Sequence, residues 1–143
     1  MYCERDDLHD YIPAAYLDAA DKVTPGIVGR KIASVCGAID DALRRHYVLP
    51  LVTVPETIKR MAAVMAAYEA IGGITAVKDD TNAGNKLLVL QDLYKQARKD
   101  LALIRDNKLE LGLDELGLEP STGANGTLAV VTRPATLNLK GWR

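Results

Sequence analysis

Residues with the chemistry for catalysis or metal binding are few in this sequence. Its two histidines, His9 and His46, are far apart, and Cys3 and Cys36 have neither metal-ligand nor redox spacing. There is no Gly-x-Ser-x-Gly sequence, and no acidic pair has the polar neighbours that general acid–base catalysis needs. The sequence therefore predicts a protein that is not an enzyme and holds no cofactor or metal. We interpret His46 as a partly buried residue near a helix C-terminus.

Two short stretches resemble ligand-binding motifs but lack their defining residues. Residues 26–31 contain glycines and a lysine without the spacer or the terminal Gly-Lys-Ser/Thr of a phosphate loop, and no expected strand precedes them. Asp79 and Asp80 do not have the spacing of a calcium loop, so we interpret them as a solvated helix cap. The two cysteines are expected to be free thiols of a cytosolic protein.

The length and charge of the chain exclude several classes of protein. Its 143 residues suit one ordinary domain, which buries about two thirds of its unfolded surface. The chain has 18 Lys+Arg against 19 Asp+Glu. This balance argues against a dedicated nucleic-acid-binding protein, because such binding relies on basic residues that neutralise phosphates. No segment approaches the ~20 apolar residues of a membrane span, and no secretory signal opens the chain.

The two ends of the chain carry opposite charge. Residues 1–27 are mainly acidic in their charged side chains, whereas residues 116–143 hold three basic residues and a single acidic one. This asymmetry is either ordinary surface variation or a sign that one subunit's terminus meets another's in a head-to-tail ring.

Residues 32–71 read as two amphipathic helices around which the rest of the chain packs. In the first, Ile32, Val35, Ile39 and Ala42 recur at helical spacing. Pro50 predicts that this helix stops near residue 47 and that residues 47–51 cross over, extended and buried.

The second of these helices is expected to begin at Pro55, with Thr53 as its cap, and to run to the glycines at 72 and 73. Its alanines allow a neighbouring helix to approach closely. Its expected buried stripe is Ile58, Met61, Met65 and Tyr68.

The remaining elements are two short N-terminal helices and one long helix. The short helices are expected over residues 3–12 and 14–20, and a polar loop over 74–85 leads to the long helix at 84–107. Leu88, Leu93 and Leu103 form a second apolar flank, which either covers a partner or is buried among the N-terminal helices. The main apolar seam of the long helix is heptad-like and comprises Leu87, Leu90, Tyr94, Ala97, Leu101 and Ile104.

The C-terminal part of the chain differs from the rest. We predict a helical domain over residues 1–118, followed by a linker and arm over 119–143. Residues 127–132 are the one strand-like run, and it pairs either with residues 136–139 or with another chain, unless the terminus is frayed. The residues proposed to contact another chain are Val130, Val131, Arg133, Leu137, Leu139, Lys140 and Trp142.

The expected fold is mainly α. It is a small bundle of four to five helices, with a long helix in the C-terminal half and an extended, partly β C-terminal arm. Its proposed core comprises Ile39, Leu43, Tyr47, Met61, Met65, Tyr68, Leu90, Tyr94 and Leu101.

Two phrases of the sequence carry a family resemblance: AIDDALRRHYVLPL at residues 38–51 and VPETIKRMAAVMAAYEA at residues 54–70. Together they resemble the Mu-like phage head-tail connector family, also called neck or adaptor proteins. The resemblance is dense over residues 38–68 and holds in outline over most of the chain. The matching residues are Ala38, Ile39, Asp40, Leu43, Arg45, Tyr47, Leu49, Pro50, Leu51 and Pro55.

The resemblance implies a structural protein of the virion neck, assembled in the host cytoplasm. Such a protein forms a ring of twelve copies that joins the portal vertex of the capsid to the tail. Its partners would be its own copies, the portal protein and a tail or neck-completion protein, with the genome passing through the lumen without sequence-specific binding and no membrane involved. The alternative is a small helical phage or prophage regulator or interaction module that acts as a monomer or dimer.

Overall fold

The computed structural model describes residues 1–72 and 81–113, and for residues 81–86 it describes the backbone alone. In these residues the chain is mainly helical and contains no strand, so the expectation of a small helical bundle is confirmed. The predicted arm at 119–143 and the acidic pair Asp79 and Asp80 lie outside the described residues. The elements in chain order are η1 (Asp6–Asp10), α1 (Ala14–Val23), α2 (Ile27–Leu43), α3 (Glu56–Ile71) and α5 (Thr81–Arg105).

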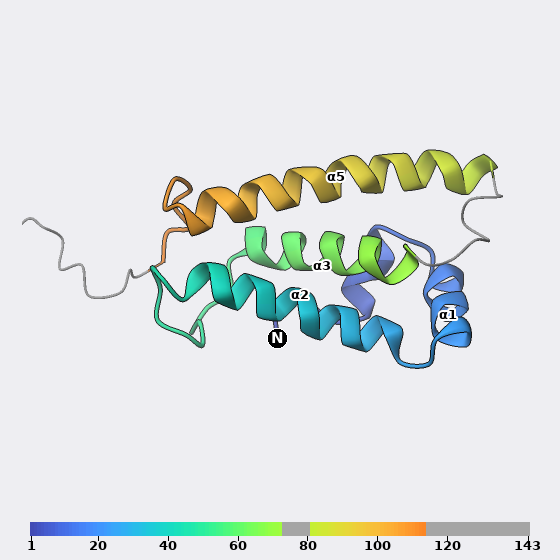
Figure 1. Ribbon diagram of the computed structural model, residues 1–143, viewed down its shortest axis with the longest axis horizontal. Helices are drawn as coiled ribbons and strands as arrows, with labels where there is room; N and C mark the ends of the chain where they lie inside the picture. Colours follow the sequence, from blue (N-terminus) through green and yellow to red (C-terminus); the bar gives the residue numbers. More distant parts are fainter. Residues whose placement is uncertain (73–80, 114–143) are drawn as a thin grey trace, which may run out of the picture.

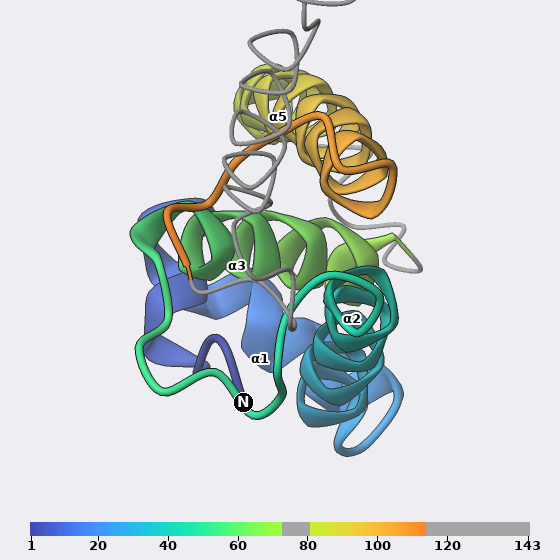
Figure 2. The same ribbon diagram turned by 90° about the vertical axis from the view of Figure 1, so that its left-hand side faces the viewer.

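Helix α3 is the centre of the bundle. It lies between α5 on one side and α1, α2 and η1 on the other (Figures 1 and 2). Every residue from Met61 to Ala67 is buried, which requires neighbours around the whole circumference of the helix. The alanines of this stretch let those neighbours approach closely. The one-sided stripe expected for this helix was therefore too narrow.

Helix α2 buries the predicted stripe against α3. Ile32, Val35, Ile39 and Ala42 are all buried, together with Leu43 at the helix end. The helix ends at Leu43, one turn earlier than expected, and a turn then brings Tyr47 into the core.

The crossing between α2 and α3 is only partly buried, contrary to the prediction. Leu49 and Leu51 pack against the core, but Val48 and Val52 are exposed. Alternate side chains of an extended segment point in opposite directions, so an apolar run there cannot all face inward. Thr53 does not cap α3, because no side chain makes a capping hydrogen bond at its N-terminus.

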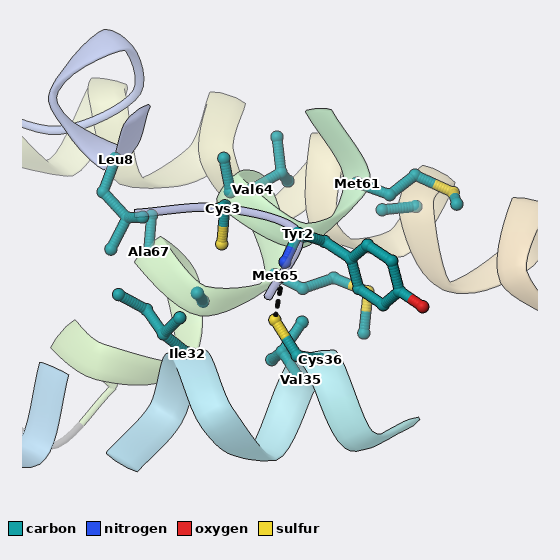
Figure 3. Packing of buried hydrophobic residues seen from close by; sticks show 14 of the residues in the cluster. Tyr2, Cys3, Leu8, Ile32, Val35, Cys36, Met61, Val64, Met65 and Ala67 are labelled. Carbon is teal, nitrogen blue, oxygen red and sulfur yellow. Dashed lines mark hydrogen bonds between the residues drawn. The ribbon is translucent and has the colours of Figure 1, made fainter. Parts of the chain in front are cut away.

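The N-terminal segment is anchored inside the bundle instead of forming the expected helix over residues 3–12. Tyr2 and Cys3 are buried, and the Tyr2 backbone N–H donates to Sγ of Cys36 on α2 at 3.4 Å (Figure 3). The Tyr2 hydroxyl also donates to the Asp40 carboxylate. Asp7 accepts a hydrogen bond from the Glu4 N–H at 2.7 Å, which satisfies a backbone donor just before η1. Only the short 3₁₀ helix η1 results.

Asp21 connects three segments of the chain. The Arg5 guanidinium contacts its carboxylate at 2.5 Å and that of Asp18 at 2.7 Å. The other oxygen of Asp21 accepts the Val28 backbone N–H at 3.3 Å, in the first turn of α2. The hydrogen bond from Arg5 lowers the pKa of Asp21. One carboxylate thus holds the N-terminal segment, α1 and the start of α2 together.

Helix α5 begins at Thr81, so residues 81–85 are helical and not part of the expected loop. Propensity is a weak prior, and extending an established helix is easier than starting one. Along its predicted seam, Leu90, Ala97 and Ile104 are buried, whereas Leu87, Tyr94 and Leu101 are half-buried.

The proposed core residues take the following places. Ile39, Leu43, Tyr47, Met61, Met65 and Leu90 are buried in one continuous cluster. Tyr68, Tyr94 and Leu101 are half-buried at its edge, where the rings of Tyr68 and Tyr94 stack with centroids 4.4 Å apart.

Candidate interaction surface

The outer flank of α5 carries a cluster of exposed apolar side chains. Leu88, Val89 and Leu93 are 59%, 62% and 41% exposed. Leu88 and Val89 lie on the outer side of the helix, whereas Leu93 lies at the edge of the buried seam, next to Leu90. We call these three residues the α5 patch. Leu103, near the other end of the helix, is also exposed. The alternative that the second flank is buried among the N-terminal helices is therefore wrong. The spacing of leucines predicted Leu88 and Leu93 but missed Val89, which lies four residues before Leu93 and hence on the same face.

A cleft of about 480 Å³ adjoins the α5 patch, and we call it the corner cleft. It forms where the chain turns from η1 into α1 at Pro13, whose extended backbone sets the corner. One wall comes from this corner and the other from α5, two parts of the chain that are distant in sequence. Its lining residues are His9, Asp10, Tyr11, Ile12, Pro13, Val89, Leu90 and Leu93.

The rim of the corner cleft is acidic. Asp6, Asp7 and Asp10 are exposed on η1, and the i, i+3 spacing of a 3₁₀ helix places Asp7 and Asp10 on one side. Asp6 and Asp10 have no ion-pair partner among the described residues. Burial raises the pKa of the Tyr11 hydroxyl, so this side chain remains neutral beside them. The cleft therefore combines apolar walls with an acidic rim, while the positive charge of Arg60 also acts on the Tyr11 hydroxyl.

A second apolar cleft, of about 680 Å³, lies where the described chain ends at residue 113. It forms between the α2–α3 crossing and the segment after α5, at the end of the bundle remote from α1 (Figure 1). We call it the exit cleft. It includes the exposed side chains of Val48 and Val52 and, after α5, the half-buried side chains of Leu111 and Leu113.

The other residues considered in the sequence do not converge on one site. His9 lines the corner cleft, whereas His46 lies with Nε2 at 2.9 Å from the Arg105 carbonyl oxygen at the end of α5. A carbonyl oxygen only accepts, so the His46 ring donates and caps α5, not its own helix as expected. Cys3 and Cys36 are buried free thiols, and burial raises the pKa of Cys3 to about 12.

The described residues show no metal site and no membrane-spanning helix, and the proposed interface residues lie outside them. In residues 1–72 and 81–113, no three His, Cys, Asp or Glu side chains gather to hold a metal ion. None of the described helices combines the length and apolar character needed to cross a membrane. The proposed interface residues lie outside the described residues: Val130, Val131, Arg133, Leu137, Leu139, Lys140 and Trp142.

Fold and surface define a small helical protein with a central buried helix and exposed apolar side chains on α5. Residues 2–130 match the family model described as Bacteriophage Mu, Gp36, so the chain belongs to that family. It is therefore a bacteriophage protein, and the resemblance to Mu-like phage proteins is confirmed at this level. No curated protein matches the chain.

Proposed function

We propose that this protein is a structural component of the phage neck, where it forms an oligomeric ring that joins the portal vertex of the capsid to the tail. The observation that carries the proposal is the α5 patch. Three neighbouring large apolar side chains are exposed on a bundle whose core is already closed by α3. Clustered exposed apolar surface of this kind marks a protein–protein contact.

The arrangement of the surfaces favours a ring over a symmetric dimer. The corner cleft and the exit cleft lie in different parts of the bundle and differ in composition, since the corner cleft alone has the acidic rim of η1. Two unlike surfaces suit a head-to-tail contact, and such a contact generates a ring when the rotation closes. Family membership and the resemblance to neck proteins support the same assembly, with twelve copies implied by the resemblance.

The proposed partners follow from this role. They are other copies of the chain, the portal protein and a tail or neck-completion protein, within the neck of a virion assembled in the host cytoplasm. The net charge of −1 suits a ring whose lumen passes the genome without binding it specifically. The role is structural, so it requires neither a catalytic residue nor a cofactor.

A small regulator or interaction module is the alternative, for which the plain composition and the heptad-like seam of α5 both speak. In the structure this seam faces α3 of the same chain, with Leu90, Ala97 and Ile104 buried. It is therefore not available to form a coiled-coil dimer, which weakens the alternative.

The mass of the assembled full-length chain tests the proposal. Twelve copies of the 15.5-kDa chain amount to about 190 kDa. We expect analytical ultracentrifugation to find a particle near this mass, either for the protein alone or after mixing with portal. A species that stops at a monomer or dimer under both conditions would favour the regulator instead.

A further inference from the structure

The corner cleft has the chemistry to receive a short segment that is both apolar and basic. Its walls are formed by Tyr11, Ile12 and Pro13 on one side and Val89 and Leu93 on the other. A volume of about 480 Å³ is in the range of sites that enclose several ligand groups. Asp10 is itself one of the lining residues, so a positive charge bound there would have an acidic residue nearby.

One segment of this same chain has the complementary composition. Residues 127–143 contain apolar side chains, the chain's single tryptophan and the basic residues Arg133, Lys140 and Arg143, with no acidic residue. Trp142 combines a large apolar ring with one hydrogen-bond donor, and tryptophan is enriched among the residues that dominate binding energy. Lys140 and Arg143 flank it closely in sequence.

We propose that the corner cleft binds residues 127–143 of a neighbouring copy, with Trp142 inserted between the α1 corner and α5. Lys140 and Arg143 then face Asp10 and Asp7 on η1. The choice of a neighbouring copy rests on the proposed ring. A segment that bound the cleft of its own chain would make no contact between subunits.

The position at which the described chain ends supports this arrangement. Residue 113 lies beside the exit cleft, whereas the corner cleft lies along the first half of α5 (Figure 1). In a head-to-tail arrangement, the end of one subunit that carries the exit cleft lies next to the corner cleft of the following subunit. Residues 114–126 span up to about 40 Å when extended, which is enough to cross between adjacent subunits.

The first experiment uses Trp142 as its own reporter, since no other tryptophan contributes fluorescence. In the full-length protein, we expect the emission to shift to shorter wavelength as concentration rises and subunits associate. Leu93→Glu should remove the shift and weaken association at least tenfold. Leu103→Glu is the matched control, because Leu103 has nearly the same exposure on the same helix but lies outside the cleft.

A second experiment tests the charge pairing without an apolar substitution. Asp10→Lys should weaken association, as should Lys140→Glu, and the two changes combined should restore most of it. The wild-type association should also weaken at high salt. Asp10 is expected to tolerate substitution because it is exposed and its carboxylate makes no ion pair among the described residues. Circular dichroism checks that each variant remains helical.

The outcomes separate this inference from the proposed function. If rings form and Leu93→Glu leaves both ring and fluorescence unchanged, the cleft assignment is wrong while the ring remains. If Trp142 is shielded at every concentration in a monomer, the segment binds its own chain and the neighbouring-copy proposal is overturned. If wild-type protein stops at a dimer whose shift depends on Leu93, the cleft assignment holds and the ring does not.

Discussion

At the scale of single residues, the carboxylate of Asp21 has the widest structural role in the bundle. It receives hydrogen bonds from Arg5 and from the Val28 backbone, and so joins segments from three parts of the N-terminal half. Both partners favour its ionised form, in agreement with the lowered pKa.

Asp21→Asn removes the ion pair with Arg5 and is therefore expected to destabilise the protein at neutral pH. The loss should be only roughly 1 kcal/mol, because the ion pair is partly exposed to solvent. The folded state lowers the pKa of Asp21, so its contribution is complete above the ordinary value of 3.8 and is lost as the pH falls through the lowered value. Urea denaturation of both proteins from pH 7 down to pH 3 measures this difference. Asp41→Asn, at an exposed position of α2, is the control. A difference that grows in acid would contradict the assigned sign.

At the scale of elements, neighbouring positions on α5 have opposite environments. Leu90 is buried against the core, whereas Leu88, two residues earlier, is exposed. The helix therefore has one side that stabilises the bundle and another side that is exposed, and the exposed side is the one we propose for a partner.

Leu90→Ala should reduce the free energy of unfolding by ~2 to 5 kcal/mol, because it opens a cavity beside α3. Leu101→Ala should cost less, since Leu101 is half-buried. Leu88→Ala is the matched control and should change stability by less than about 0.5 kcal/mol. Equal losses for Leu88 and Leu90 in urea denaturation would show that the helix face is assigned wrongly.

Sequence periodicity predicted those elements that bury one face. It located α2 and the seam of α5, because large apolar residues there alternate with charged ones at helical spacing. It also located α3 but underestimated its buried face, since alanines on every side of that helix give no directional signal although all of them are buried. It failed for residues 3–12, where Tyr2 and Cys3 are buried in the core and only the short helix η1 forms.

The candidate surface was predictable only in part, for a different reason. Leu88 and Leu93 could be recognised as a second flank because they lie within one helix. The corner cleft could not, because it joins residues 9–13 to residues 89–93, and no local pattern reports that proximity.

At the scale of the whole molecule, the described bundle contains its own continuous core from Tyr2 to Ile104. Removal of residues 127–143 should therefore leave helicity and melting temperature nearly unchanged while preventing ring formation. Circular dichroism and ultracentrifugation of the shortened protein measure the two effects separately. If the shortened protein unfolds, the segment belongs to the fold of its own subunit. If it still forms rings, the subunit contact lies elsewhere, with the α5 patch as the next candidate.

The role in joining heads to tails is tested most directly in a phage from which this protein has been removed. Electron microscopy of lysates is expected to show DNA-filled heads and separate, complete tails, because the ring between them is missing. Adding the purified wild-type protein should then produce joined, infectious particles, whereas Leu93→Glu should fail and Leu103→Glu should succeed. Joined infectious particles formed without the protein would contradict the proposed function, as would an arrest before the heads are filled.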